Sequence, residues 1–202
     1  MIRVKICGIT NVEDAIYASK LGAHALGFIF YQGSKRYISP EEARAIIDKL
    51  PPFIVKVGVF VNEKESEILD IYNYLSLDRV QIHADFPVKY VNLPARNVIM
   101  AYRVKAKEDI DAAMCSEYFP LLDRYDEKEY GGTGKSFDWS LLNGIKRPYI
   151  LAGGINLDNI ERVFELKPYA IDISSGVEKE YGKKDYQKMF EIFSKLRENL
   201  ML

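Results

Sequence analysis

Hydrophobic residues along this chain follow two different periods in turn, which predicts strands and helices in strict alternation. Short apolar runs, several with every second residue apolar, precede stretches whose apolar residues recur every three or four positions. The expected strands are residues 2–7, 23–30, 53–61, 79–83, 97–104, 118–123, 149–152 and 169–173. The expected helices are residues 11–21, 40–49, 63–75, 86–92, 107–114, 138–143, 156–165 and 184–200.

Two of the helix starts carry clear local signals. Asn11 is a candidate N-cap for the first helix, and Gly22 follows that helix as a stop. The second helix follows a capping pattern, with Ser39 at the cap, Pro40 at the first helical position and Glu42 three residues after the serine. These signals support the helical reading of both segments independently of their hydrophobic period.

Eight strand–helix units of about 25 residues each predict one closed (β/α)8 TIM barrel of parallel strands. No linker or shift in composition divides the chain, so we expect residues 1–202 to form one domain. The alternative is a doubly wound open sheet. That fold would need more polar edge strands than this sequence offers.

Composition narrows the class of protein. The chain has 202 residues, of which 48% are hydrophobic and 28% charged, as in a globular protein. Its net charge of −1 creates no field that favours nucleic acid or an anionic membrane surface. Two cysteines form no disulfide framework and no metal-binding spacing. The chain starts with a strand and has no apolar run of 18 residues, so we expect a cytoplasmic protein without a bound metal.

Reactive side chains collect where the predicted strands end. Barrel enzymes build their sites at the carboxyl ends of the strands. Candidates at these ends, or in the loops that follow, are Cys7, Arg36, His83, Arg103, Asp123 and Asp172. Each has an ordinary structural explanation when taken alone, such as a buried small cysteine or a solvated loop arginine. Their shared position is the reason to expect an active site.

Two glycine-containing turns follow the last two strands. Gly153 and Gly154 follow the seventh strand, and Ser174, Ser175 and Gly176 follow the eighth. Barrels often bind phosphate here through backbone N–H groups and a short helix start. We therefore expect a phosphorylated small-molecule substrate to bind at these turns.

The segment Gly131–Ser136 ends in Gly-Lys-Ser and superficially suggests a nucleotide-binding loop. The nucleotide motif needs a glycine five residues before its Gly-Lys pair, and that position is Glu129. The segment also follows a charged loop rather than a strand. A lid that closes on the substrate, spanning about residues 124–137, fits this composition better.

With these residues assembled, the chain resembles the phosphoribosylanthranilate isomerase family of tryptophan biosynthesis. The resemblance runs from end to end and rests on eight short motifs in order. They are KICGIT at 5–10, GFIF at 27–30 with SKR at 34–36, GVFVN at 58–62, QIH at 81–83, LLD at 121–123, GGTGK at 131–135 with FDW at 137–139, LAGGI at 151–155 and DISSGVE at 172–178.

The resemblance implies an Amadori rearrangement of an aminoaldose to an aminoketose, without a cofactor. It implies that Asp123 is the general acid and Cys7 the general base. Arg36 would hold the anthranilate carboxylate, and Asp172 would contact the opened sugar or its nitrogen. His83 would support Cys7 or the substrate. We leave Arg103 open between a substrate contact and a structural ion pair.

The chain departs from the family pattern at three places, none of them at the reacting residues. Ala84 follows the fourth-strand histidine where glycine is usual, and Tyr102 precedes the fifth-strand arginine where phenylalanine is usual. Tyr181 and Gly182 stand where Pro-Gly is frequent after the last motif. These differences affect local geometry rather than the expected reaction.

Three other functions remain as alternatives. The related isomerase of histidine biosynthesis has an aspartate at the end of its first strand, where this chain has Cys7. Indole-glycerol-phosphate synthase needs a catalytic lysine and additional N-terminal helices. A barrel that only binds a phosphosugar would need neither Cys7 nor Asp123. The sequence does not decide between a monomer and a homodimer.

An acid that acts on the ring oxygen and a base that acts on C2 must reach the sugar from different sides. Strands 1 and 6 of an eight-stranded barrel are separated by two others. We therefore expect Cys7 and Asp123 to point into the barrel mouth without a hydrogen bond between them.

Overall fold

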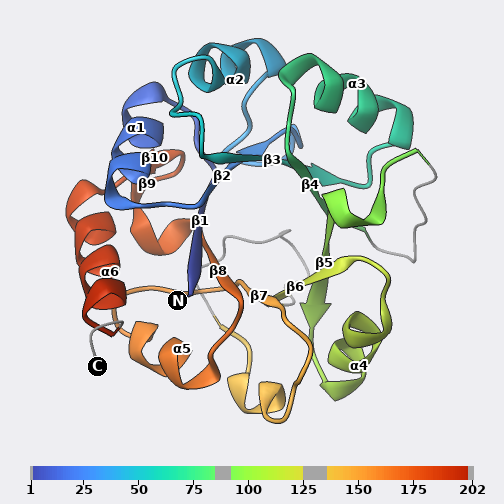
Figure 1. Ribbon diagram of the computed structural model, residues 1–202, viewed down its shortest axis with the longest axis vertical. Coiled ribbons are helices and arrows are strands. Elements are labelled where there is room, and N and C mark those ends of the chain that lie inside the picture. Colours follow the sequence, from blue (N-terminus) through green and yellow to red (C-terminus); the bar gives the residue numbers. More distant parts are fainter. Residues whose placement is uncertain (1, 85–91, 125–135, 200–202) are drawn as a thin grey trace.

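The computed structural model of the chain describes residues 2–84, 92–124 and 136–199. Eight parallel strands close into a barrel in chain order, so that β1 pairs with both β2 and β8. Figure 1 shows the strands around the centre and the helices around the outside. The predicted (β/α)8 barrel is confirmed.

The strands and helices keep the order that the hydrophobic pattern predicts. The barrel strands are β1 (Arg3–Cys7), β2 (Ala25–Ile29), β3 (Val55–Val61), β4 (Arg79–His83), β5 (Val98–Val104), β6 (Phe119–Arg124), β7 (Ile150–Leu151) and β8 (Ala170–Ile173). The α-helices are α1 (Val12–Leu21), α2 (Pro40–Ile47), α3 (Glu65–Leu75), α4 (Lys107–Cys115), α5 (Ile160–Leu166) and α6 (Tyr186–Asn199). Short 3-10 helices are η1 (Ala95–Asn97), η2 (Trp139–Leu142) and η3 (Ser175–Val177), and β9 (Glu178–Glu180) pairs with β10 (Lys183–Lys184). None of the helices in the described ranges is long and apolar enough to cross a membrane.

The expected helix signals are confirmed. The Asn11 side chain accepts a hydrogen bond from the Asp14 backbone N–H at 2.8 Å, and Gly22 ends α1 with a left-handed φ of 102°. Ser39 and Glu42 form a reciprocal capping box at the start of α2.

Alternation along the strands separates two apolar cores. Residues such as Ile6 and Ile82 point outward into the larger cluster beneath the helices. A smaller cluster, which includes Val57, Leu121 and Ile150, fills the inside of the barrel. Because side chains alternate along a strand, the inward positions nearest the carboxyl ends are left for polar side chains.

The main topological difference from the prediction is a small hairpin after β8. The expected helix 184–200 begins at Tyr186, because Lys183 and Lys184 instead pair antiparallel with β9. Lys184 is 1% exposed, and its backbone N–H donates to the buried carboxylate of Asp14 at 2.8 Å. The helical period of the following residues gave no sign of this pairing, which depends on contacts distant in sequence.

Other predicted boundaries shift for local reasons. The expected helix 156–165 starts at Ile160, because the Asn156 side chain accepts from the Asp158 N–H and forms a turn. The third strand begins at Val55, where pairing with Ala25 starts, and Phe53 before it is 94% exposed. The expected helix 138–143 is the 3-10 helix η2. The expected helix 86–92 falls almost wholly on residues 85–91, outside the described part of the chain.

Candidate active site

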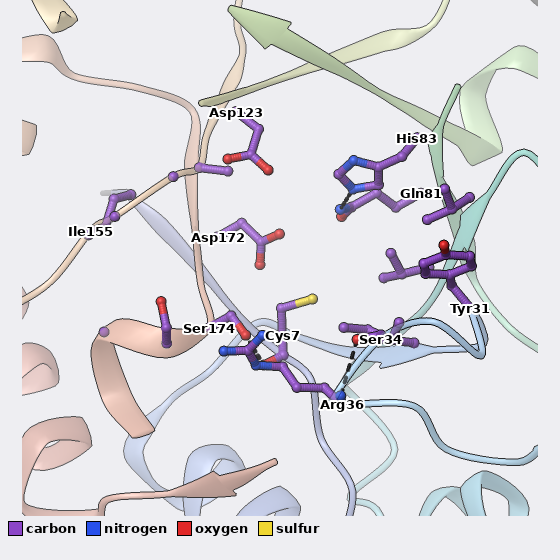
Figure 2. Close-up of a pocket in the computed structure, with 18 residues that line it drawn as sticks. Cys7, Tyr31, Ser34, Arg36, Gln81, His83, Asp123, Ile155, Asp172 and Ser174 are labelled. Carbon is purple, nitrogen blue, oxygen red and sulfur yellow. Dashed lines mark hydrogen bonds between the residues drawn. The ribbon is translucent and has the colours of Figure 1, made fainter. Parts of the chain in front are cut away.

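The carboxyl ends of the barrel strands enclose a pocket. Figure 2 shows Cys7 from β1, Asp123 from β6 and Asp172 from β8 gathered around it, together with residues from the loops that follow β2, β7 and β8. Ten of the eleven residues that the sequence nominated line this pocket: Cys7, Arg36, His83, Asp123, Gly153, Gly154, Asp172, Ser174, Ser175 and Gly176. Residues more than 160 positions apart in the chain therefore share one space.

Arg103 is the nominated residue that is absent from the described pocket lining. It lies on β5 directly opposite Asp123 in the strand register. Its positive charge helps to lower the pKa of Asp123, although burial of that carboxyl has a larger and opposite effect. Arg103 therefore acts on the site electrostatically, from the neighbouring strand.

Cys7 is a buried thiol with close neighbours on several sides. It is 6% exposed, and a Cβ on Gly27 would lie 2.8 Å from its Sγ, so the glycine makes room for the sulfur. Burial and the charge of Asp172 raise the pKa of the thiol, while the ammonium groups of Lys5 and Lys184 oppose that rise. The positive groups limit the rise without cancelling it, so the pKa of the buried thiol stays above its ordinary value.

Asp123 has the environment of a carboxylic acid that holds its proton at neutral pH. It is 5% exposed, and this burial raises its pKa from 3.8 to about 7. The Arg124 backbone N–H donates to its Oδ1 at 2.7 Å and partly offsets the burial. A Cβ on Gly153 would lie 2.8 Å from the same oxygen, so this glycine leaves space for the Asp123 carboxyl.

Cys7 and Asp123 face the same pocket without contacting each other, as the chemistry requires. Figure 2 shows Asp172 in the space between them. Among the described residues, no hydrogen bond joins the Cys7 thiol to the Asp123 carboxyl. The expected separation of acid and base agrees with this arrangement.

The two glycine turns have unusual backbone geometry and lie close together. Gly153 and Gly154 adopt left-handed φ values of 85° and 70°, which glycine accepts without strain. A Cβ on Gly176 would lie 1.9 Å from the Ile155 carbonyl oxygen, so the turns after β7 and β8 approach closely. None of the hydrogen bonds within the described residues uses the backbone N–H of Gly153, Gly154, Ser175 or Gly176. Within the described part of the chain, these N–H groups thus have no partner of the protein's own, which is what the expected phosphate site requires.

Arg36 is held by a buried carboxylate that the sequence analysis did not assign a role. Its Nε lies 2.9 Å from Oε1 of Glu178, and its Nη2 lies 2.7 Å from Oε2. The same carboxylate accepts from Lys184 Nζ at 2.9 Å. Burial alone would raise the pKa of Glu178, but Arg36 and Lys184 outweigh it and lower the pKa below its ordinary value.

Two further polar residues inside the barrel escaped the sequence analysis. Lys5 is 3% exposed, and its Nζ donates to Asp172 Oδ2 and to Gln81 Oε1, both at 2.8 Å. Gln81 lies 3.0 Å from His83 through their two Nε2 atoms. Strand alternation was the available signal, since Lys5 shares a face with Cys7 and Gln81 shares one with His83.

Part of the expected site lies outside the described residues. The segment expected to form a lid, about 124–137, falls almost entirely on residues 125–135. Within the described ranges, no group of three or more histidine, cysteine or acidic side chains could hold a metal ion.

Comparison with known proteins gives a consistent result. Residues 4–195 match the sequence family described as N-(5'phosphoribosyl)anthranilate (PRA) isomerase. The N-(5'-phosphoribosyl)anthranilate isomerase of Thermotoga maritima is 47% identical over 198 residues, which cover 94% of this chain and 97% of that protein. The corresponding enzyme of Geobacter sulfurreducens is 44% identical over 201 residues, which cover 98% and 99% of the two chains.

Solved structures agree with the sequence comparison. The crystal structure of phosphoribosyl anthranilate isomerase from Thermotoga maritima superposes with a TM-score of 0.87 at 42% identity, covering 98% of this chain and all of that chain. A complex of such an isomerase with reduced 1-(o-carboxyphenylamino)-1-deoxyribulose 5-phosphate gives a TM-score of 0.83 at 39% identity, with 98% and 100% coverage.

The raised pKa of Asp123 predicts a pH-dependent stability. A carboxyl whose pKa is higher in the folded state contributes stability at low pH that is lost as pH rises from 3.8 to about 7. In Asp123→Asn this loss should be absent. The variant should therefore gain about 4 kcal/mol of unfolding free energy relative to the wild type between pH 4 and pH 8. Urea unfolding of both proteins at pH 4 and pH 8 measures this gain. If the unfolding free energies of variant and wild type differed by the same amount at both pH values, the raised pKa of Asp123 would be contradicted.

Proposed function

The chain belongs to the N-(5'-phosphoribosyl)anthranilate isomerase family, and on this premise we propose which of its residues carry out the reaction. The enzyme isomerises N-(5'-phosphoribosyl)anthranilate to 1-(2-carboxyphenylamino)-1-deoxyribulose 5-phosphate in tryptophan biosynthesis. The reaction is an internal redox change, in which C1 is reduced as C2 is oxidised. It needs one acid, one base and a site that orients the sugar between them.

Asp123 is the general acid of the ring-opening step. It protonates the ring oxygen, so the C1–O bond breaks while the nitrogen lone pair forms a C1=N bond. A carboxyl with a pKa of about 7 still holds its proton in a large fraction of molecules at neutral pH, whereas an ordinary aspartate would not. This buried acid, facing a buried thiol across one pocket, is the observation that carries the proposal.

Cys7 is the general base of the second step. Its thiolate removes the proton from C2, the C–H electrons form a C1=C2 bond, and the electron pair of the C=N bond returns to nitrogen. The resulting enol becomes the ketone when its hydroxyl proton leaves and C1 gains a proton. Lys5 and Lys184 favour the thiolate through their positive charge and partly offset burial and Asp172, which raise the pKa of the thiol.

The remaining pocket residues bind and orient the substrate. The backbone N–H groups of the turns at Gly153–Gly154 and Ser174–Gly176 hold the phosphate. Asp172 contacts the opened sugar or its nitrogen, and His83 supports the substrate. Arg36 recognises the anthranilate carboxylate with its planar guanidinium. Its partner Glu178 keeps that group oriented at the pocket wall.

Removal of either reacting group should abolish most of the turnover. Cys7→Ala and Asp123→Asn should each lower kcat by at least about a hundredfold, the usual contribution of a general acid or base. Exposed residues offer matched controls, and Cys115→Ala and Asp158→Asn should retain the wild-type kcat. The assay follows turnover of phosphoribosylanthranilate. An inactive wild type would favour a phosphosugar-binding barrel instead, and full activity of either site variant would remove that residue from the mechanism.

Arg36→Ala should mainly raise KM, because a group that binds substrate and transition state alike changes binding without changing kcat. Glu178→Gln is the comparison, since it removes the charge that orients Arg36 but keeps the guanidinium. Steady-state kinetics of both variants should give a larger rise in KM for Arg36→Ala. A fall in kcat with unchanged KM would assign Arg36 to the chemical steps.

Gly176→Ala should weaken phosphate binding. The added methyl group would lie 1.9 Å from the Ile155 carbonyl oxygen and push the two turns apart. We expect KM to rise about tenfold or more and inhibition by inorganic phosphate to weaken in parallel. Gly144→Ala is the control for a glycine substitution away from the pocket: Gly144 has open space around it, and its left-handed φ of 82° makes the variant locally strained without touching the two turns. Equal inhibition by phosphate in both variants would place the anion elsewhere.

A further inference from the structure

The interior of the barrel contains a hydrogen-bond network with Lys5 at its branch point. One arm runs from Lys5 Nζ to Asp172 Oδ2 at 2.8 Å. The other runs from the same nitrogen to Gln81 Oε1 at 2.8 Å, and from Gln81 Nε2 to His83 Nε2 at 3.0 Å. All four side chains are at most 8% exposed, so water does not compete for these contacts.

The chemistry of each group fixes the direction of every hydrogen bond in the second arm. An ammonium group only donates, so the Gln81 oxygen faces Lys5 and the amide nitrogen faces His83. The amide nitrogen also only donates, so His83 Nε2 is the acceptor. A neutral imidazole carries one proton, which must then be on Nδ1.

The surroundings of His83 favour the neutral form of its imidazole. Burial, with a smaller contribution from the charges of Lys5 and Arg103, lowers its pKa to about 3. Other charged or titratable groups that line the pocket include the Cys7 thiol, the carboxyls of Asp123 and Asp172, and the Arg36 guanidinium, which is paired with Glu178. Asp172 is held in the ion pair with Lys5, and Asp123 retains its proton to about pH 7.

Both arms end in a polar atom that lacks a partner. Within the described residues, His83 Nδ1 and Asp172 Oδ1 are buried and make no hydrogen bond. Both residues line the pocket, and Figure 2 shows their side chains on its wall. A buried polar atom without a hydrogen-bond partner lowers the stability of the fold by about 1–3 kcal/mol. A ligand that forms hydrogen bonds with these two atoms would remove that penalty.

We propose that Lys5 and Gln81 are positioning residues that hold His83 as a neutral N–H donor and Asp172 as an acceptor, both directed at the substrate. This inference rests on the proposed function and names the substrate groups that fit. Asp172 Oδ1 accepts from the nitrogen that joins anthranilate to the sugar. His83 Nδ1 donates to an oxygen of the substrate, either a sugar hydroxyl or the anthranilate carboxylate.

Nitrogen-15 NMR of the histidine side chains tests the predicted tautomer without any substrate. The chain has two histidines, and the other, His24, accepts from the Val4 backbone N–H through Nδ1 and so carries its proton on Nε2. The wild type should therefore show one histidine of each neutral tautomer. His83→Asn assigns the signals. The His83 signal should keep the Nδ1–H pattern from pH 8 down to pH 5, and an Nε2–H pattern or titration in this range would overturn the proposal.

Gln81→Glu tests the link between the network and turnover. A glutamate still accepts from Lys5 but cannot donate to His83, so the imidazole must place a proton on Nε2. The NMR pattern of His83 should change accordingly, and kcat/KM should fall at least about tenfold. Gln187→Glu, at an exposed position on α6 beside Glu191, is the control and should leave both readouts unchanged.

The two readouts separate this inference from the proposed function. If the wild type does not convert phosphoribosylanthranilate, the function fails, while the wild-type spectrum still decides the tautomer. If Gln81→Glu changes the tautomer but leaves kcat/KM intact, His83 does not donate to the substrate and the inference is wrong.

If Gln81→Glu does not fold, Lys5→Met provides the second variant. It should also lose the Nδ1–H pattern, and retention of that pattern would exclude Lys5 as the branch point.

Discussion

The site depends on a single buried ammonium group. Lys5 lies inside a barrel whose remaining interior is largely apolar, where an unpaired charge would be too costly to bury. Asp172, opposite Lys5 where the last strand closes on the first, and Gln81 on β4 offset that cost with two hydrogen bonds of 2.8 Å. Because the ammonium charge also acts to lower the pKa of the Cys7 thiol, the ion pair in the polar interior influences the proposed base.

A second cluster of buried charges contacts the turn that follows β1, at the backbone of Cys7. Lys184 donates to the Cys7 carbonyl at 2.6 Å and to the Glu178 carboxylate, which also holds Arg36. The hairpin that follows β8 is thereby fixed to the turn that follows β1. One carboxylate shared between two cations leaves net positive charge near Cys7, which favours a thiolate in a place where burial disfavours it.

Environment gives two chemically similar carboxyl groups different tasks. Asp123 has no cation within hydrogen-bonding distance among the described ion pairs, and burial raises its pKa to about 7. Asp172 is paired with Lys5 at 2.8 Å and keeps its second oxygen for the pocket. One group is suited to donating a proton and the other to accepting a hydrogen bond. In the proposed mechanism, separating acid and acceptor in this way lets one pocket serve both halves of the reaction.

The sequence by itself determined the eight-unit barrel, because hydrophobic period and helix caps depend on residues close together in the chain and can be read directly from it. It also placed Cys7, Asp123 and the two glycine turns at one pocket, since strand ends are where a barrel exposes reactive groups. It did not reveal that Lys184 forms a hairpin, because its helical neighbourhood is locally convincing. Nor did it reveal the roles of Lys5 and Gln81. A lysine in a strand looks like a surface residue until the strand 167 positions later brings Asp172 to it, and only the closed barrel makes that contact.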